Sequence, residues 1–233
     1  TVLLTRRHHG LESYVIFIDL IKAFDSVDHD MMYAILKRYG IPEWLIAVIK
    51  KMYNNSAVKI EVGKESELVN YLTGVQQGDN MAPVIFLFVM QAAIDSLEQK
   101  LMATIEFRYH STRKDPAKQF GKFIGQNTRT AGSILRVNNF LFVDDGAFVF
   151  ATYDIAQRAA QIIVDHFQEF GLTVHTGDEA TKSKSKTEAV FFPPSIKESH
   201  ELEDVPPNLS LNGGKFIPFT RTFKYLGSTI THD

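Results

Sequence analysis

The stretch "NNFLFVDDGAFVF", residues 138–150, places two adjacent aspartates inside an almost wholly apolar run. An ionised carboxylate that leaves water is costly to fold unless a partner compensates its charge. Two adjacent carboxylates also repel each other, which raises the pKa of one of them. Asp-Gly between β-rich runs is a signal for a hairpin turn. Asp144 and Asp145 therefore form either a solvated turn at a hairpin tip or part of a cation site.

The composition limits which metal such a site could bind. The chain has no cysteine, which excludes disulfides, thiolate zinc sites and a cysteine nucleophile. Its eight histidines are scattered, and none are paired at the spacing of metal ligands on a helix. We therefore expect any bound metal to be a hard cation held by oxygen atoms, such as Mg²⁺ or Mn²⁺.

Charge and hydropathy give weaker indications. The net charge of −2 argues weakly against nucleic-acid binding, but basic residues concentrate between Lys100 and Arg136 and could line a groove for phosphates. The longest apolar run, about residues 81–90, is too short for a bilayer, and the first ten residues lack the pattern of a signal peptide. We expect an intracellular protein without membrane association. The missing initiator Met leads us to expect a segment of a larger polypeptide.

The hydrophobic pattern predicts alternating strands and helices. A buried strand over residues 14–19 ends at Asp19, and one helix ends at Gly40 while the next begins at Pro42. A helix capped by Asp154 ends at Gly171. The other predicted elements are a strand over 57–63, a long helix from Pro83 toward Leu101, a hairpin over 140–150, strands at 172–174 and 187–192, and a final strand at 223–230.

Two segments interrupt this order. Residues 103–137 are polar, basic and weakly patterned, and we expect an insertion or a mobile loop there; residues 193–208 are expected to form a connecting loop. The remaining order predicts an α+β, ferredoxin-like (split β-α-β) sheet with helices on one face. In such a sheet the first strand and the central hairpin are neighbours. Asp19 is therefore expected to face Asp144 and Asp145, which favours a cation site over a solvated turn.

Clustered carboxylates that hold two Mg²⁺ ions suit phosphoryl transfer, because one ion activates the attacking hydroxyl and the other neutralises the leaving pyrophosphate. Template-directed polymerases and nucleotide cyclases use this arrangement on related sheets. A third possibility is a palm-like scaffold that binds RNA or protein without catalysis, although a scaffold has no need of clustered acids.

Five motifs, in order, resemble those of a reverse transcriptase of a non-LTR (LINE-type) retrotransposon. They are "FIDLIKAFDSVDH" (17–29), "GVQQGDNMAPVIF" (74–86), "FVDD" (142–145), "FGLTVHT…KSKTEAVFF" (170–192) and "FKYLGSTIT" (223–231). The resemblance covers about residues 10–230 and implies an RNA-directed DNA polymerase palm with part of the fingers. It also implies two Mg²⁺ or Mn²⁺ ions, an RNA template, a DNA primer and dNTPs. The "QG" loop and the last motif disfavour a cyclase.

The resemblance assigns roles to individual residues. Asp19, Asp144 and, less directly, Asp145 are implied as catalytic metal ligands, helped by the carbonyl of Leu20. Lys186 falls on the lysine of the fourth motif, a candidate proton donor to pyrophosphate. Lys184 competes for that role, because the segment "DEATKSKSK" blurs the register.

Substrate contacts follow in the same way. Phe24 falls where the family packs a side chain against the incoming sugar, with core packing as the alternative. Gln77 and Gly78 match the loop that lies against the nucleotide and the templating base. Tyr225 and Leu226 match the β-hairpin that grips the primer and are equally plausible as core residues.

The sequence also departs from the family pattern. Val143 occupies a position that usually carries a small residue. Only 18 residues precede Asp19 and the chain stops at Asp233, so the upstream fingers and the downstream thumb are expected to lie outside it. We expect a larger polyprotein that supplies both, with an endonuclease as a further candidate part.

Overall fold

A computed structural model describes most of the chain, which forms two compact units. Unit one consists of Thr1–Asp19, Lys100–Ile162 and His175–Asp233, and unit two consists of Leu20–Gln99 and Ile163–Val174. The described residues are all except 1, 55–56, 64, 71–72, 77, 102–104, 111–121, 125–132, 138, 196, 199–204 and 232–233.

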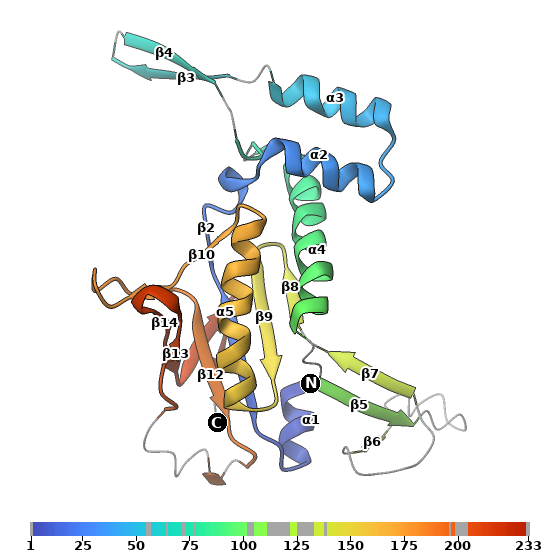
Figure 1. Cartoon of the computed structure of the whole chain (residues 1–233), viewed down its shortest axis with the longest axis vertical. Coiled ribbons are helices and arrows are strands. Elements are labelled where there is room, and N and C mark those ends of the chain that lie inside the picture. The colour runs from blue at the N-terminus through green and yellow to red at the C-terminus, as the bar shows by residue number, and fades with distance from the viewer. Residues whose placement is uncertain are drawn as a thin grey trace. The chain divides into compact units, whose positions relative to one another are not determined.

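Unit one is built on a five-stranded sheet with the strand order β15-β12-β1-β9-β8. Figure 1 labels three of its strands, β12, β9 and β8. The central strand β1 (Ser13–Ile18) is buried at every position and pairs antiparallel with both of its neighbours. These are β12 (Glu188–Phe192) and β9 (Asp145–Phe150), while β8 (Asn139–Phe142) and β15 (Phe219–Thr220) form the edges. The strand predicted at 14–19 is thus confirmed to within one residue, as is its pairing with the Asp-Asp hairpin.

One face of this sheet carries a hydrophobic core. Alternate residues of the three central strands, including Val15, Phe17 and Val149, form one buried cluster, as the two-residue period of a strand requires. The cluster packs against α1 (Val2–His8) and against the hairpin of β16 (Thr222–Tyr225) and β17 (Ser228–Thr231). The centroids of Phe17 and Phe223 are 4.4 Å apart in a stacked arrangement.

That hairpin corrects the prediction of a single final strand over 223–230. The chain reverses at Leu226 and Gly227, whose φ angles of 49° and 79° both lie in the left-handed region. Two such residues in succession make the tight turn that joins antiparallel strands. The hydrophobic pattern did not predict this turn, because Leu-Gly lacks the Asn or Asp that usually precedes glycine in a hairpin turn. The hairpin agrees with the fifth motif of the family resemblance.

Helix α5 (Tyr153–Glu169) begins two residues earlier than predicted. Thr152, and not Asp154, provides the cap, because its hydroxyl accepts a hydrogen bond of 3.4 Å from the backbone N–H of Ile155. The predicted end at Gly171 is confirmed by its φ of 71° and by the bond from the N–H of Leu172 to the carbonyl of Phe167.

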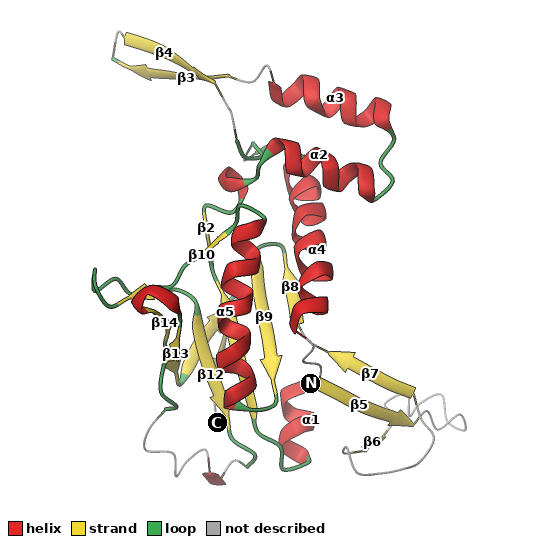
Figure 2. Ribbon diagram, in the orientation of Figure 1, coloured by secondary structure: helices red, strands yellow, loops and turns green. Residues whose placement is uncertain are grey.

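Unit one also contains two small sheets (Figure 2). Strands β5 (Ile105–His110), β6 (Lys122–Ile124) and β7 (Ser133–Val137) pair in the order β6-β5-β7, so the weakly patterned segment 103–137 contains strands that its sequence did not predict. The second sheet joins β11 (Gly177–Asp178), β14 (Lys215–Ile217) and β13 (Leu209–Ser210), with the short helix η2 (Asn212–Gly214) between the last two.

Unit two is mainly helical. Its helices are η1 (Phe24–Ser26), α2 (His29–Arg38), α3 (Glu43–Asn54) and α4 (Ala82–Leu101), and its strands are the pairs β2 (Leu20–Ile21) with β10 (Thr173–Val174) and β3 (Ala57–Val62) with β4 (Glu65–Asn70). The helices predicted to end at Gly40, to begin at Pro42 and to run toward Leu101 are confirmed. None of the described helices is long and apolar enough to cross a membrane.

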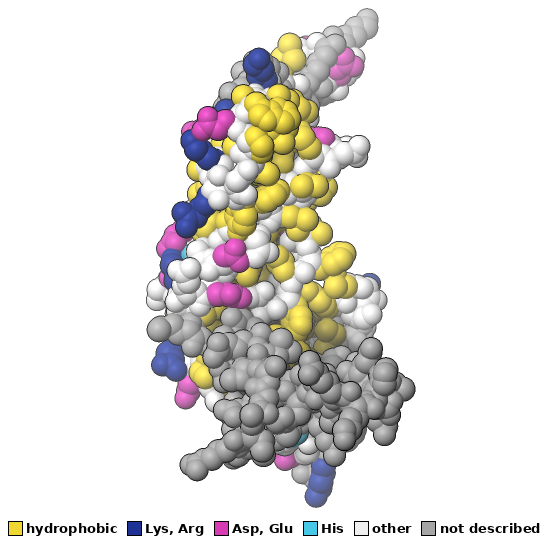
Figure 3. Space-filling model, turned by 90° about the vertical axis from the view of Figure 1, so that its right-hand side faces the viewer, with side chains coloured by type: hydrophobic (Ala, Val, Ile, Leu, Met, Phe, Trp, Pro, Cys, Tyr) yellow, Lys and Arg dark blue, Asp and Glu magenta, His cyan; other side chains and the backbone are white. Residues whose placement is uncertain are grey.

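Hydrophobic side chains reach the surface of the molecule (Figure 3). In α3 they form a stripe at four-residue spacing, with Trp44 at 69% exposure, Val48 at 46% and Met52 at 49%. Met52 therefore lies on the exposed face of α3 with Trp44 and Val48. Ile46, Ile49 and Tyr53 are the buried residues of this helix.

Candidate active site

Asp19 lies opposite the Asp-Asp hairpin. In the antiparallel pairing of β1 and β9, Ile18 is the partner of Gly146, so the next position along places Asp19 across from Asp145. The hairpin pairs Phe142 with Asp145, which leaves Val143 and Asp144 as a two-residue turn. The two aspartates therefore do sit at a hairpin tip, and the tip is beside the end of the first strand.

The electrostatics show that the charges of Asp144 and Asp19 both act on Asp145. The pKa of Asp145 is raised above its ordinary value, first by burial and then by the negative charges of Asp144 and Asp19. Tyr225 adjoins this group, because its hydroxyl donates a hydrogen bond of 3.4 Å to the backbone carbonyl of Asp145. Burial and the charge of Asp145 raise the pKa of Tyr225 as well.

The donor chemistry of this cluster fits a hard divalent cation. All three side chains offer carboxylate oxygens, and a cation would relieve the repulsion that raises the pKa of Asp145. Within the described ranges, however, no group of three or more His, Cys, Asp or Glu side chains is arranged around a common point as metal ligands. The side chains would have to turn toward a shared cation.

Val143 adopts a conformation that its side chain disfavours. Its φ of 58° lies in the left-handed region, where β-branched residues are rarely found. The strain agrees with the family pattern, in which a small residue occupies this position. A strained residue directly before Asp144 indicates that the surrounding strands hold the turn in place.

The backbone of Asp19 is fastened to the fourth motif. The N–H of Asp19 donates a hydrogen bond of 3.1 Å to the hydroxyl of Thr187, a fully buried residue. The carbonyl of Asp19 accepts a bond of 2.8 Å from the N–H of His175. Lys186 is the neighbour of Thr187, and its side chain is exposed.

Lys184 has different surroundings from Lys186. It lines a cavity of about 500 Å³ in unit one, together with Lys182, Glu188, Phe216 and Thr220. Sequence reasoning did not single out His175 or Thr187. Their contacts with Asp19 join residues far apart in the chain, and no spacing rule predicts such contacts.

Unit two holds the residues implied in nucleotide binding. The ring of Phe24 stacks on Phe86 of α4 with centroids 4.5 Å apart, and Phe24 remains partly exposed. The carbonyl of Phe24 accepts a bond of 2.8 Å from the N–H of Val75. The next residues repeat this link, because Gly74 donates its N–H to the carbonyl of Val27 at 2.7 Å.

His29 completes the link between the first and second motifs. Its Nε2–H donates a bond of 2.8 Å to the carbonyl of Gly74. Gly78 is exposed with a φ of 95°, a conformation that favours glycine. Gln77 lies outside the described residues. Leu20 is buried in β2, where it pairs with Val174.

The two residues of the fifth motif differ in burial. Tyr225 packs against the core cluster of the sheet and reaches Asp145, as described above. Leu226 is 50% exposed at the tip of the hairpin, which excludes the core-packing interpretation for this residue.

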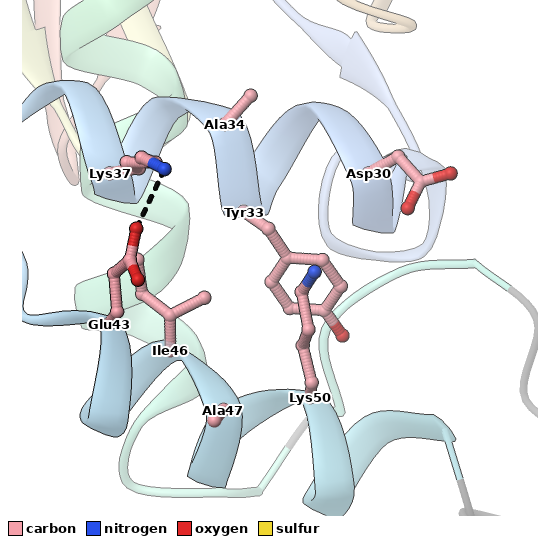
Figure 4. Close-up of a pocket in the computed structure, with 8 residues that line it drawn as sticks. All are labelled: Asp30, Tyr33, Ala34, Lys37, Glu43, Ile46, Ala47 and Lys50. Carbon is pink, nitrogen blue, oxygen red and sulfur yellow. Dashed lines mark hydrogen bonds and ion pairs between the residues drawn. The ribbon is translucent and has the colours of Figure 1, made fainter.

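A separate cavity of about 450 Å³ lies between α2 and α3 (Figure 4). Lys37 and Glu43 form an ion pair of 2.7 Å across it, and the amino group of Lys50 lies 4.8 Å from the ring centroid of Tyr33. None of the residues implied by the motifs lines this cavity.

Comparisons with known proteins test the family resemblance of the five motifs. The family model described as "Reverse transcriptase (RNA-dependent DNA polymerase)" matches residues 3–230. A retrovirus-related Pol polyprotein from type-1 retrotransposable element R2 of Bradysia coprophila is 25% identical over 222 residues, which are 94% of this chain and 22% of that protein. The polyprotein from type-2 retrotransposable element R2DM of Drosophila melanogaster is 30% identical over 98 residues, or 42% of this chain and 9% of that protein.

A solved structure is similar in fold. The structure of apo telomerase from Candida tropicalis, truncated from its C-terminal domain, superposes with a TM-score of 0.58 at 11% identity. The superposition covers 99% of this chain and 37% of the telomerase chain. This chain spans about one fifth or less of the length of the two polyproteins. The resemblance of the five motifs is confirmed, and the chain belongs to the reverse transcriptase (RNA-dependent DNA polymerase) family.

Proposed function

We propose that this chain is the palm, with part of the fingers, of an RNA-directed DNA polymerase and that it takes part in template-directed nucleotidyl transfer. The observation that carries the proposal is the placement of Asp19 opposite Asp145, with the pKa of Asp145 raised by burial and then by the charges of both other carboxylates. The sheet order β12-β1-β9-β8 supports a ferredoxin-like palm, because it is the order that a split β-α-β sheet requires.

The carboxylates are proposed as the ligands of two divalent cations. Asp19, Asp144 and Asp145, with the carbonyl of Leu20, would hold them. When bound, such cations supply Lewis acidity to the attacking 3′-hydroxyl and neutralise charge on the leaving pyrophosphate. Lys186 is proposed to donate a proton to the pyrophosphate. The backbone N–H of Lys186 bonds to His175, and the N–H of His175 bonds to the carbonyl of Asp19. This connection supports Lys186 over Lys184 as the proton donor.

The remaining residues are proposed to bind substrates. Phe24 would lie under the sugar of the incoming dNTP, Gln77 and Gly78 against the nucleotide and the templating base, and Tyr225 and Leu226 against the primer. The contact between Tyr225 and the backbone of Asp145 supports a primer grip beside the carboxylates. An RNA template and a DNA primer are the proposed partners. Because the matched relatives are polyproteins, the rest of such a polyprotein would supply further parts of the fingers, the thumb and any endonuclease.

Primer extension on an RNA template, with Mg²⁺ and all four dNTPs, tests this proposal. Asp19→Asn and Asp144→Asn should each abolish extension and weaken Mn²⁺ binding in calorimetric titration. Asp30→Asn, an exposed carboxylate on the α2–α3 cavity, is the matched control and should change neither. If the protein binds an RNA–DNA hybrid equally well in all variants and never extends it, the scaffold alternative holds instead.

A further inference from the structure

We propose that His175 is a positioning residue that holds Lys186 beside Asp19, and that Lys186 is therefore the lysine that serves the active site. The inference rests on the proposed function and adds a residue that none of the five motifs assigned a role. His175 directly follows β10, and it contacts both Asp19 and the segment 185–187.

The backbone of His175 fixes the polypeptide around Asp19. Its N–H donates to the carbonyl of Asp19 at 2.8 Å, and its own carbonyl accepts from the N–H of Thr187 at 3.2 Å. Thr187 in turn accepts the N–H of Asp19 on its hydroxyl at 3.1 Å. These three bonds form a closed circuit, so Asp19, His175 and Thr187 hold one another in a fixed arrangement.

The side chain of His175 extends this arrangement to Lys186. Its Nδ1 accepts a hydrogen bond of 3.2 Å from the backbone N–H of Lys186. In this bond the imidazole Nδ1 is the acceptor and the backbone N–H of Lys186 is the donor. The carbonyl of His175 also accepts the hydroxyl of Ser185 at 2.9 Å. Three successive residues, Ser185 to Thr187, are thus bonded to one histidine.

The residues between these attachments form an excursion, residues 177–185, whose first strand β11 pairs with β14. Asp178 and Ser183 exchange two backbone hydrogen bonds, of 3.2 and 3.1 Å. The carboxylate of Asp178 also accepts the N–H groups of Ala180 and Thr181 at 2.8 and 3.2 Å. Lys182 and Lys184 belong to this excursion and line the cavity of about 500 Å³, together with residues of β12 and β14. Lys186 follows the excursion and is bonded directly to His175.

Only one of these contacts depends on the histidine side chain, which allows a sharp test. His175→Ala removes the Nδ1 acceptor and leaves every backbone bond possible. His175→Asn places an oxygen acceptor at the same number of bonds from Cβ as Nδ1, whereas His175→Gln places it one bond further away. Lys182→Ala is the control on the excursion.

The first readout is hydrogen exchange of the Lys186 amide, followed by NMR in the full chain. Its protection should fall about tenfold in His175→Ala, the effect of losing one hydrogen bond, and should return in His175→Asn. The amide of Ser183, bonded within the excursion, should stay protected in both. Urea unfolding of each variant separates this local loss from a general loss of stability.

The second readout is single-turnover nucleotide addition on a primed RNA template. His175→Ala should slow the transfer step about five- to tenfold with an unchanged KM for dNTP, because Lys186 is misplaced while the substrate contacts remain. His175→Asn should restore the rate. His175→Gln should be as slow as His175→Ala, and Lys182→Ala should be as fast as the wild type. Lys186→Ala should be slower than Lys184→Ala.

Two results would overturn the inference: unchanged protection of the Lys186 amide in His175→Ala, or an Asn variant that is as impaired as the Ala variant. A wild-type chain that never extends a primer would refute the proposed function, and the exchange experiment would still decide the contact between His175 and Lys186.

Discussion

The hydroxyl of Thr187 accepts the backbone N–H of Asp19 at 3.1 Å, although 168 residues separate the two in sequence. Thr187→Val keeps the shape of the side chain but leaves this N–H without a partner at a fully buried position. We expect the free energy of unfolding to fall by about 1–3 kcal/mol, the cost of an unsatisfied buried donor. Urea unfolding measures the loss.

Thr187→Ser is the control for that experiment, since it keeps the hydroxyl. Hydrogen exchange of the Asp19 amide should stay slow in the Ser variant and become fast in the Val variant. Slow exchange in both variants would show that the hydroxyl does not protect this amide.

Asp145 gives the protein a predictable pH dependence. Its folded-state pKa is raised above the ordinary value of 3.8 by burial and by Asp144 and Asp19. A raised carboxyl pKa means that the folded state binds the proton more tightly than the unfolded state does. Ionisation of Asp145 therefore lowers the free energy of unfolding. This loss is absent at acid pH, develops as pH rises through the folded pKa, and is complete at neutral pH. Asp145→Asn should therefore stabilise the fold at pH 7, and this gain should shrink below about pH 4.

Divalent cations should change this result in a defined direction. Mn²⁺ at pH 7 should raise the melting temperature of the wild type and reduce the advantage of Asp145→Asn, because the cation relieves the same repulsion. Asp30→Asn, on the α2–α3 cavity, should show no such dependence on Mn²⁺. A wild-type melting temperature that does not change on addition of Mn²⁺ would argue against a cation site at the hairpin.

The turn before Asp144 should become more stable with glycine. Val143 has a φ of 58°, and the strain of a β-branched residue there exceeds the entropic cost of glycine in the unfolded chain. Val143→Gly should raise the free energy of unfolding by about 0.5–1 kcal/mol. Lys182→Gly, at a φ of 55° but without a branched Cβ, should give a smaller gain. Chemical denaturation of both variants makes the comparison, and a less stable Val143→Gly protein would contradict the strain.

Gly74 should be the most sensitive glycine of the second motif. A Cβ at this position would lie 2.7–2.9 Å from backbone atoms of Asp25, and the φ of 86° adds strain for any other residue. Gly74→Ala should cost about 3 kcal/mol, with clash and strain combined. At Gly78 the φ is 95° but no atom lies within 4 Å of the Cβ position, so Gly78→Ala should cost only about 1 kcal/mol. Equal losses in urea unfolding would show that Asp25 moves aside.

Phe24 offers a test of sugar choice. With its partly exposed ring supported by Phe86, Phe24→Val should shorten the side chain and raise rNTP incorporation by up to ~100-fold, while dNTP incorporation stays within about tenfold. Primer extension with each nucleotide type, in a protein that includes the upstream fingers, measures both. Phe86→Leu is the control: it weakens the same stack and should lower stability without admitting rNTPs. If both variants lose the two activities equally, Phe24 is a core residue.

The sequence predicted most of the framework, because apolar periodicity and Gly or Pro punctuation report directly on local structure. The ends of α2 and α5, two residues before Gly40 and Gly171, and strands β1 and β12 follow from such local signals. The Leu226–Gly227 turn and the Thr152 cap did not, because weaker residues occupy positions where Asn or Asp is usual. The strands between 105 and 137 are too polar for their pattern to be read.

Some contacts of the candidate site could likewise be predicted from the sequence and others could not. The pairing of Asp19 with the hairpin could be predicted, because the order of elements places the two strand ends together. The contacts of His175 and Thr187 could not, since they depend on where two distant backbone segments meet. The stacking of Phe24 on Phe86 could not be predicted either, because it depends on how α4 packs, and the hydrophobic pattern does not determine that packing.

The excursion over residues 177–185 has a consequence for comparing this chain with its relatives. It leaves and rejoins the fold at His175 and Thr187, pairs with β14 through Gly177 and Asp178, and is closed by the two hydrogen bonds between Asp178 and Ser183. Insertions or deletions between Asp178 and Ser183 would therefore leave Lys186 where it is. An alignment that counts residues onward from Gly171 would assign the lysine wrongly in any relative with a longer or shorter excursion. Alignments anchored at these two attachment residues should recover it, and loop-deletion variants of this chain would show how short the excursion can become.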